Sequence, residues 1–299
     1  MKSKPEVIIV GAGPAGMATA LQLKRYGIDA VLFEKDRPGG LLINARLVEN
    51  VMGFPEGISG PDLVKLFCGQ LKRFDINAVN ETVMKIDYDE ISETFSVSTN
   101  GGSHYPVGVV VASGTRANEW DQLNSMLSEI KKYIFHEVVS LLDEKGKKII
   151  IIGAGDAAFD YALNLSAENE VLILNRGTEI KALPLLKDRV KKNPAIDYMD
   201  QATIKSIDPG KKRSLAVGVR QNGKNTIREA NFIVCALGRE PDKRFYTLAL
   251  NKLEEQLILR GSLHLVGDVC NGSYRQVSIA TGNGIQAAMK IYHQWGKGQ

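Results

Sequence analysis

Residues 6–35 and 148–177 repeat one another at a constant offset of 142 positions. The matched positions include the glycines and the residue that stands in for one of them: Gly11 and Gly153, Gly13 and Gly155, Gly16 and Ala158. Self-similarity at a fixed offset indicates a duplicated structural unit. A chain of 299 residues is long enough for two domains, so we expect one domain around each copy.

Each copy predicts the same order of elements. A short run rich in Ile and Val is followed by a glycine turn, a segment with Ala and Leu at helical spacing, and a second apolar run. This order is typical of a parallel strand–helix–strand unit of about thirty residues. We therefore predict an α/β fold with two doubly wound, Rossmann-like domains.

The second domain is expected to be an insertion within the first. The apolar runs Val107–Ala112 and Phe232–Leu237 both indicate buried strands. We take the ends of these two strands, at Thr115 and Gly238, as the points where the chain crosses between the domains. The predicted domains are then residues 1–117 with 238–299, and residues 118–237.

The remaining segments belong to the first domain in this prediction. Residues 79–97 alternate apolar and polar side chains, and Asn100-Gly101-Gly102 follows them as a turn signal. This pattern favours an antiparallel meander. The segment from Ser262 to the helical stretch Ile279–Trp295 is expected to return to the first domain.

The first glycine turn, residues 11–16, has the context that a dinucleotide fingerprint requires, because it follows a strand and opens a helix. Gly11 permits the tight turn, Gly13 lets the backbone approach a pyrophosphate, and Gly16 lets the helix pack on the strand. The free N–H groups and the dipole at the helix start favour phosphate at this point. Glu34, at the end of the second strand, is placed to accept hydrogen bonds from a ribose.

The second glycine turn, residues 153–158, follows a strand and opens a helix in the same way, so we expect a second nucleotide there. At the offset of 142 from Glu34, the chain has Arg176 after Asn175 in place of an acid. A carboxylate would repel a ribose 2′-phosphate, whereas an arginine can pair with it. This favours NADP over NAD, and the alternative interpretation is a solvated surface arginine.

Along nearly its whole length the chain resembles the flavoproteins with two dinucleotide-binding domains. The resemblance is strongest to thioredoxin reductase and to the ferredoxin–NADP reductases built on its plan. Besides the two turns, it rests on four segments: residues 38–41, 47–61, 267–269 and 274–277. It implies FAD at the first turn and NADPH at the second.

The resemblance also implies which residues contact each cofactor. For FAD they are Gly11, Gly13, Pro14, Ala15, Gly16, Glu34, Lys35, Gly40, Leu41, Asn50, Val83, Ser113, Gly114, Gly267, Asp268, Arg275, Gln276 and Val277. For NADP they are Gly153, Gly155, Asp156, Ala157, Ala158, Asn175, Arg176 and Gly238. Leu41 departs from the family, which usually has Gln there. By the same resemblance, Asp268 holds the ribityl chain.

The main departure from the family concerns its dithiol. Thioredoxin reductases carry a C-x-x-C pair just before the second turn, and residues 135–140 contain no cysteine here. Without a thiolate near the flavin, electrons cannot leave through an internal dithiol. Cys68, Cys235 and Cys270 are far apart, and each is interpreted as a small apolar structural residue. Their odd number argues against a disulfide framework and for a reducing compartment.

His136 and Glu137 occupy the region that the dithiol has vacated. They are candidates for a proton donor or a pair that orients a ligand, the alternative being an exposed linker segment. The other histidines, at positions 104, 264 and 293, have no metal-ligand spacing among themselves or with the cysteines. No metal site is therefore expected.

Charge and hydropathy exclude several classes of function. The net charge is only +4, and residues 118–237 carry 18 basic and 16 acidic side chains, so no region is typical of nucleic-acid binding. No stretch approaches the roughly 20 apolar residues that cross a bilayer. The run Val7–Val10 is too short for a signal peptide. We expect a cytoplasmic protein, and the family resemblance implies a homodimer.

These observations predict an FAD-dependent NAD(P)H oxidoreductase. It would transfer a hydride from NADPH to FAD and pass the electrons to a non-dithiol acceptor such as ferredoxin, a quinone or another small molecule. Ferredoxins are acidic, and four basic runs could dock one, although a solvated rim would also explain them: Lys131-Lys132, Lys147-Lys148, Lys191-Lys192 and Lys211-Lys212-Arg213. Two alternatives remain, a non-catalytic FAD-binding redox sensor and a thioredoxin reductase-like enzyme that acts without its own dithiol.

Overall fold

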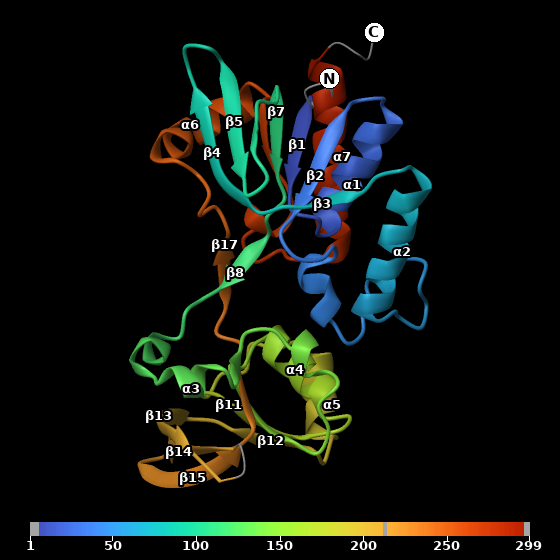
Figure 1. Cartoon of the computed structure of the whole chain (residues 1–299). Helices are drawn as coiled ribbons and strands as arrows, with labels where there is room; N and C mark the ends of the chain where they lie inside the picture. The colour runs from blue at the N-terminus through green and yellow to red at the C-terminus, as the bar shows by residue number, and fades with distance from the viewer. Residues whose placement is uncertain (1–5, 212–213, 296–299) are drawn as a thin grey trace. The chain divides into compact units, whose positions relative to one another are not determined.

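The computed structural model describes residues 6–211 and 214–295, which form two compact units. Within the described residues, unit 1 comprises 6–43, 47–116 and 240–295, and unit 2 comprises 44–46, 117–211 and 214–239. The chain passes between the units in two strands that pair as a small sheet, β8 (Thr115–Ala117) and β17 (Arg239–Pro241), seen in Figure 1.

Unit 1 is built on a five-stranded parallel sheet in the order β18-β7-β1-β2-β3. The strands are β1 (Val7–Val10), β2 (Ala30–Glu34), β3 (Ala78–Asn80), β7 (Gly108–Val111) and β18 (Leu263–Leu265). The main helices are α1 (Pro14–Arg25), α2 (Gly60–Arg73), α6 (Leu248–Leu259) and α7 (Val277–Gln294). The predicted return of the C-terminal segment is confirmed, because β18 pairs with β7 and α7 packs on α1.

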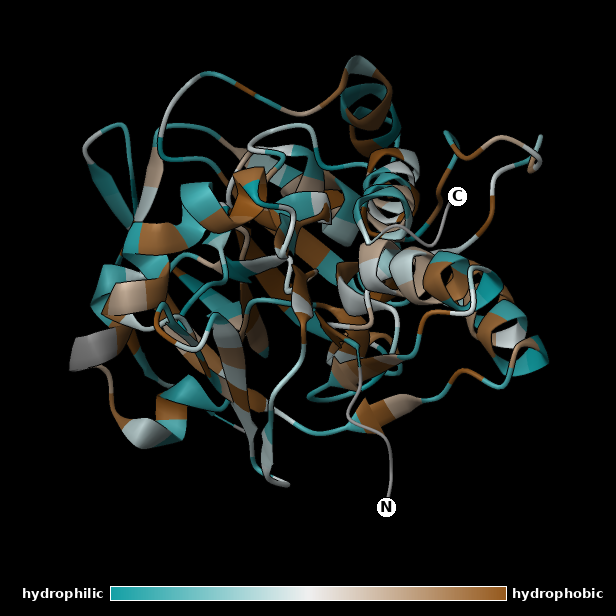
Figure 2. Cartoon of the chain, turned by 90° about the horizontal axis from the view of Figure 1, so that it is seen from above, coloured by the Kyte–Doolittle hydropathy of each residue, from teal (hydrophilic) through white to brown (hydrophobic). Residues whose placement is uncertain are grey.

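The central strand of unit 1 is apolar on both faces, as a parallel strand covered on both sides requires. Val7 and Ile9 face a core that α1 and α7 complete, whereas Ile8 and Val10 face a core shared with the antiparallel strands and α6. Figure 2 shows the apolar residues gathered on the central strands. The sheet therefore lies between two layers, one of helices and one mainly of strands.

The antiparallel meander of unit 1 is confirmed, but it begins later than the sequence predicted. It consists of β4 (Val83–Asp89), β5 (Thr94–Thr99) and β6 (Ser103–His104). Val79 belongs instead to β3, where it pairs in parallel with Phe33. Alternation of apolar residues cannot distinguish these cases, because strands of both kinds can bury alternate side chains.

Unit 2 repeats the parallel sheet, in the order β12-β11-β10-β16-β9. Its strands are β9 (Ile134–Phe135), β10 (Lys148–Ile152), β11 (Glu170–Leu174), β12 (Ile196–Met199) and β16 (Phe232–Cys235). Ile149 and Ile151 face the core beneath α4 (Asp156–Leu165) and α5 (Pro184–Lys191). The predicted α/β fold with two Rossmann-like sheets is therefore confirmed.

The opposite face of the unit 2 sheet carries a layer that the sequence analysis did not predict. Here β13 (Ala202–Pro209), β14 (Leu215–Gln221) and β15 (Lys224–Ala230) form an antiparallel sheet whose buried residues share a core with Ile150. The short helix α3 is Ser128–Lys131, and the 3-10 turns are Gly40–Asn44, Asp121–Ser125, Val139–Leu141 and Gly267–Val269. None of the helices within residues 6–211 and 214–295 has the length and apolar character that a bilayer crossing needs.

Candidate functional site

The first glycine turn joins β1 to α1, and its three glycines have different roles. Gly11 has a φ of +101°, and a Cβ there would lie 2.6 Å from the Ala112 carbonyl oxygen. A Cβ on Gly16 would overlap the Gly11 carbonyl oxygen. Gly13 is different, since its backbone is extended and a Cβ would meet no atom within 4 Å. The fold therefore requires glycine at positions 11 and 16, whereas the space beside Gly13 is open.

Glu34 is positioned at the end of β2 beside this turn. Its Oε2 accepts a hydrogen bond from Ala12 N at 2.8 Å, and its Oε1 accepts one from Asp36 N at 3.1 Å. Each carboxylate oxygen accepts two hydrogen bonds at full capacity, so acceptor positions remain for a ribose. Gly39 N in turn donates to the Ala12 carbonyl at 2.8 Å, which holds the loop after β2 against the turn.

Several expected FAD residues gather around the first turn in unit 1. Gly40 lies against Gly13, with its Cβ position 3.3 Å from the Gly13 Cα. Gly267, at φ +74°, packs on Ala15. Asn50 Nδ2 donates to Gln276 Oε1 at 2.8 Å just before α7 begins, so two expected FAD residues from distant segments are directly bonded.

The turn after β7 is held by a buried aspartate that the sequence analysis did not single out. Ser113 Oγ donates to the Asp242 carbonyl at 2.7 Å, and Asp242 N donates to the Gly114 carbonyl at 3.1 Å. The Asp242 carboxylate accepts two hydrogen bonds from Arg244, at 2.8 and 2.9 Å, and lies 3.8 Å from the exposed Lys35 ammonium. The Arg244 side chain is the main cause that lowers the pKa of Asp242 below its usual value.

The remaining expected FAD residues are distributed as follows. Val83 is buried at the start of β4, Val277 begins α7, and Pro14 begins α1. Leu41, Asp268 and Arg275 are half-buried, and each already has an interaction within the protein. Most of the expected FAD residues thus lie at the carboxyl ends of the strands or at helix starts, where ligands of α/β sheets bind.

The second glycine turn reproduces the first in unit 2. Gly153 has a φ of +138°, and a Cβ there would overlap the Ala236 carbonyl oxygen. Gly155 is extended with no atom within 4 Å of a Cβ, and Ala158 is buried at the position of Gly16. The middle glycine again borders open space. Of the other expected NADP residues, Ala157 is exposed and Gly238 is exposed at φ +90°.

The constant offset between the repeats changes by one residue within them. Strand pairing opposes Val10 to Phe33 in unit 1 and Ile152 to Leu174 in unit 2. The counterpart of Glu34 is therefore Asn175, and Arg176 lies one position beyond it. The reason is local: α1 has 12 residues and α4 has 10, so the second copy reaches its next strand earlier.

The Asn175 side chain is turned into its own loop. It is buried, its Nδ2 donates to the Glu179 carbonyl and the Tyr198 hydroxyl at 2.9 Å each, and its Oδ1 accepts from Gly177 N at 3.1 Å. Every polar atom of this amide is engaged, so Asn175 shapes the loop rather than offering a free group. Arg176 beside it is exposed.

The same loop brings a second cation to the turn, Lys181, which the sequence analysis missed. Lys181 N donates to the Ala154 carbonyl at 2.8 Å, and Leu183 N donates to Asp156 Oδ1 at 2.7 Å. The first of these bonds reproduces the one from Gly39 to Ala12, and Lys181 stands 142 positions after Gly39. The sequence carries little signal for Lys181, because the matching Gly39 has no side chain and the bond to Ala154 depends on the fold.

Glu137 lies in a hydrogen-bonded cluster of unit 2. Its Oε1 accepts from Arg239 Nη1 at 2.5 Å, and its Oε2 accepts from Tyr161 OH at 3.1 Å and Asn44 Nδ2 at 2.8 Å. Burial, followed by the Glu137 charge, raises the pKa of Tyr161. Three donors hold this carboxylate in place. The neighbouring His136 is half-buried, and its Nδ1 is buried without a hydrogen-bond partner in the described part of the chain.

The three cysteines are all unpaired and occupy three different settings. Cys235 is buried in β16, and burial raises the pKa of its thiol to about 12. Cys68 is half-buried on α2, with its pKa raised for the same reason. Cys270 is exposed, contrary to the expectation of a buried apolar residue, because it follows the 3-10 turn on the outside of the unit. Among the described residues, no group of three His, Cys, Asp or Glu side chains is arranged to hold a metal ion.

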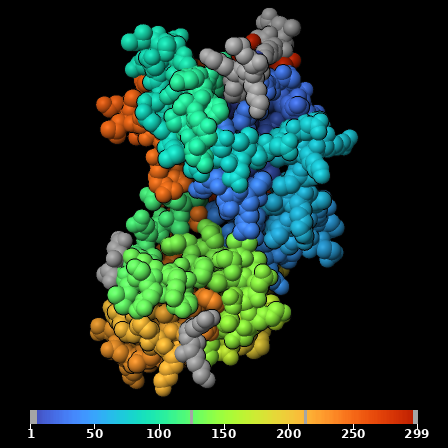
Figure 3. All heavy atoms as spheres, viewed as in Figure 1, coloured from blue at the N-terminus to red at the C-terminus, as the bar shows by residue number. Residues whose placement is uncertain are grey.

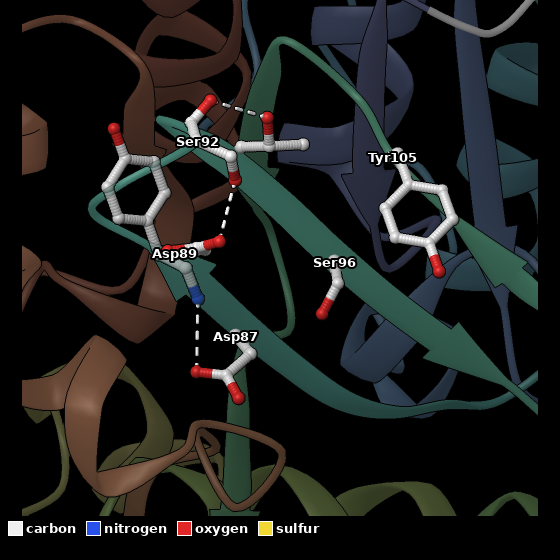
Figure 4. A pocket seen from close by; sticks show the side chains of 7 residues that line it. Asp87, Asp89, Ser92, Ser96 and Tyr105 are labelled. Carbon is white, nitrogen blue, oxygen red and sulfur yellow. Dashed lines mark hydrogen bonds between the residues drawn. The ribbon is translucent and has the colours of Figure 1, made fainter.

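A hollow of about 530 Å³ lies on the β4–β5 hairpin of unit 1 (Figure 4). Its carboxylates have local partners: Asp89 accepts from Ser92 Oγ at 2.8 Å and Ile91 N at 3.0 Å, and Asp87 accepts from Thr247 Oγ1 at 2.7 Å. The hollow contains none of the expected nucleotide residues. The two glycine turns are the better candidates for function.

A family model for pyridine nucleotide-disulphide oxidoreductases matches residues 5–284. The chain belongs to this family. It is 27% identical to a thioredoxin reductase of Rickettsia felis, over 97% of this chain and 98% of that one, and 29% identical to a thioredoxin reductase of Listeria monocytogenes, over 93% and 90%. The crystal structure of T. acidophilum thioredoxin reductase superimposes with a TM-score of 0.83 at 25% identity, covering 97% and 98% of the two chains.

The match explains why the fold contains two glycine turns. Thioredoxin reductases of this family use FAD and NADPH. The predicted resemblance to thioredoxin reductase is confirmed. The three cysteines of this chain, at positions 68, 235 and 270, form no C-x-x-C pair.

Proposed function

We propose that this chain is an NADPH-dependent flavoprotein reductase that delivers electrons to an acceptor outside the chain without an internal dithiol. One observation carries the proposal. Gly13 and Gly155 have extended backbones that any residue adopts, and a Cβ at either would meet open space. The protein alone gives no reason for glycine at these positions, whereas close approach of a pyrophosphate does.

The two turns offer different groups to their ligands. In unit 1, Glu34 would accept hydrogen bonds from the adenosine ribose of FAD, with the start of α1 facing the phosphates. In unit 2, Arg176 and Lys181 would pair with the 2′-phosphate of NADPH. When bound, FAD supplies a centre that takes up a hydride and can release electrons singly or in pairs.

The acceptor in this proposal is a ferredoxin, a quinone or another small molecule. The relatives are named thioredoxin reductases, so reduction of thioredoxin by a route without the internal dithiol is the competing candidate. Neither route is expected to use a thiol of this chain in place of the dithiol, because burial raises the pKa of the Cys68 and Cys235 thiols and the three cysteines are unpaired. A redox sensor without catalytic turnover would have no need for the open space beside Gly155 at the second glycine turn. The homodimer implied by the resemblance belongs to the same proposal, and sedimentation equilibrium measures it.

The middle glycines allow each cofactor to be removed separately. Gly13→Val should fold but lose flavin, and Gly155→Val should keep flavin, bleach with dithionite and fail to bleach with NADPH. Anaerobic spectra of the purified proteins measure both effects. The wild type should bleach with NADPH and reoxidise when a quinone or a ferredoxin is added. A wild-type protein that binds no flavin, or a Gly155→Val variant that still bleaches with NADPH, would overturn the proposal.

A further inference from the structure

Residues 176–192 of unit 2 carry as much net charge as the whole chain. This segment has six basic and two acidic side chains, which gives +4, the same as the net charge of all 299 residues. The rest of the protein is therefore neutral overall. We call this segment the basic strip. In the space-filling view, the yellow-green atoms of this part of the chain lie at the surface of unit 2 (Figure 3).

Most of the cations in the basic strip form no ion pair with the described residues. In the described part of the chain no ion pair is formed by five of the six, namely Arg176, Lys181, Lys187, Lys191 and Lys192. Elsewhere in unit 2, Lys145, Lys147 and Lys148 each pair with a glutamate. Among the described residues Lys205, Lys224 and Arg228 of the same unit also form no ion pair, so what distinguishes the basic strip is its net charge of +4 within 17 residues.

The strip also exposes apolar side chains next to its charges. Leu183 and Leu185, at the start of α5, are 54% and 51% exposed. They are not needed for the core, because α5 packs through Leu186 and Val190. An apolar centre with a charged rim is the usual composition of a protein–protein contact.

The nucleotide accounts for only part of the strip. Arg176 and Lys181 belong to the second glycine turn, where the proposed function assigns them to the 2′-phosphate. Lys187, Lys191 and Lys192 lie further along α5 and at its end, and their charge remains available when NADPH is bound.

We propose that α5, with Leu185, Lys187, Lys191 and Lys192, is a docking surface for an acidic protein that accepts the electrons. This inference rests on the proposed function and specifies its acceptor class. An acidic protein fits better than a nucleic acid, since the strip has no aromatic side chain on which a base could stack. Asp188 and Glu179 within the strip would repel a phosphate backbone, and the exposed leucines would find no partner on it.

The test compares two charge reversals of equal size. One is Lys187→Glu/Lys191→Glu/Lys192→Glu on the proposed surface. The other, a matched control, is Lys205→Glu/Lys224→Glu/Arg228→Glu on the β13–β15 sheet of the same unit, where all three residues are exposed. NADPH-driven reduction is measured with an acidic [2Fe–2S] ferredoxin, an acidic flavodoxin, basic cytochrome c and the uncharged quinone menadione, at 20 and 300 mM NaCl.

For an acidic carrier, kcat/KM of the wild type should fall as salt rises. In the α5 variant, kcat/KM for the acidic carrier should be lower by roughly 10-fold or more at low salt, and it should depend much less on salt. The control should stay within about 2-fold of wild type, and menadione reduction should be equal in all three proteins. Leu185→Ser should weaken binding of the carrier by a few-fold without changing the salt dependence.

If both triple variants lost the same amount of kcat/KM for the acidic carrier, the proposed docking surface would be wrong. It would also be wrong if the protein bound duplex DNA more tightly than every acidic carrier. Calorimetric binding of the carriers keeps the two proposals separate. If NADPH does not bleach the flavin and neither menadione nor any carrier is reduced, the proposed function fails, while binding of an acidic carrier that the α5 variant abolishes still supports the surface. If menadione is reduced and no acidic carrier binds, only the docking surface fails.

Discussion

The two glycine turns come from matching stretches of sequence, yet the residues opposite them carry different charge. At the first turn, the strand end offers the Glu34 carboxylate, which is bonded to the turn itself through Ala12 N. At the second, Asn175 takes that position and its side chain bonds to its own loop and to Tyr198 of β12, and the loop brings the backbone of Lys181 to Ala154. One scaffold therefore presents an acceptor of hydrogen bonds in one unit and cations in the other. The strand end, not the glycine motif, distinguishes the two turns.

The largest effect is expected where the two turns differ in packing. Gly16→Ala places a Cβ against the Gly11 carbonyl oxygen, whereas the counterpart position already holds the buried Ala158. The substitution should destabilise unit 1 by about 3 kcal/mol or more and release flavin. Ala158→Gly, the matched control, should cost only about 1 kcal/mol. Chemical denaturation with flavin fluorescence measures both, and similar losses in the two variants would contradict the difference.

Removing the carboxylate should have the next largest effect. Glu34→Ala leaves Ala12 N without its partner and removes the acceptor for the ribose, so FAD affinity should fall by roughly 100-fold. Glu34→Gln keeps one acceptor oxygen, so its affinity for FAD should lie between that of the wild type and that of Glu34→Ala. Titration of the apoprotein with FAD gives both constants. Unchanged affinity in Glu34→Ala would remove this residue from the flavin site.

The cations of the second turn should determine the choice of nicotinamide cofactor. Arg176→Ala/Lys181→Ala should raise the KM for NADPH by about 10-fold or more, because charge-assisted hydrogen bonds to the 2′-phosphate are lost. The KM for NADH, which lacks that phosphate, should change little. Steady-state kinetics with menadione compare the two cofactors. If the KM for NADH rose as much as the KM for NADPH, Arg176 and Lys181 would not recognise the 2′-phosphate.

The smallest effect concerns Asp242, the acid that holds the turn after β7 in unit 1. Arg244 lowers the pKa of Asp242, so the ionised form stabilises the fold above the usual aspartate pKa, and this contribution is lost as pH falls below about 4. Asp242→Asn should cost about 1 kcal/mol at pH 7 and flatten the pH dependence of stability between about pH 3 and 5. Urea unfolding across this range measures it. If the free energy of unfolding of Asp242→Asn changed with pH as steeply as that of the wild type, Asp242 would not be the cause of this pH dependence.

The repeat made the parallel sheets and both glycine turns predictable, since strand, turn and helix signals are local. The shift of one residue between the two repeats was not predictable from the constant offset. It depends on where α4 ends and on which residues of β11 pair with β10, and only the fold shows both. Lys181 was missed since its role depends on a backbone bond to Ala154 rather than on a motif. Cys270 differed from expectation because exposure depends on the fold around it.

The arrangement of the chain has a consequence for its synthesis. Apart from residues 44–46, unit 2 is one uninterrupted stretch, whereas unit 1 needs β18 and α7 from the last sixty residues to flank β7 and α1. On the ribosome, unit 2 can complete its core first, while the N-terminal half of unit 1 waits with β7 as an open edge. Loss of the C-terminal segment should therefore leave a folded unit 2 attached to an aggregation-prone remnant of unit 1.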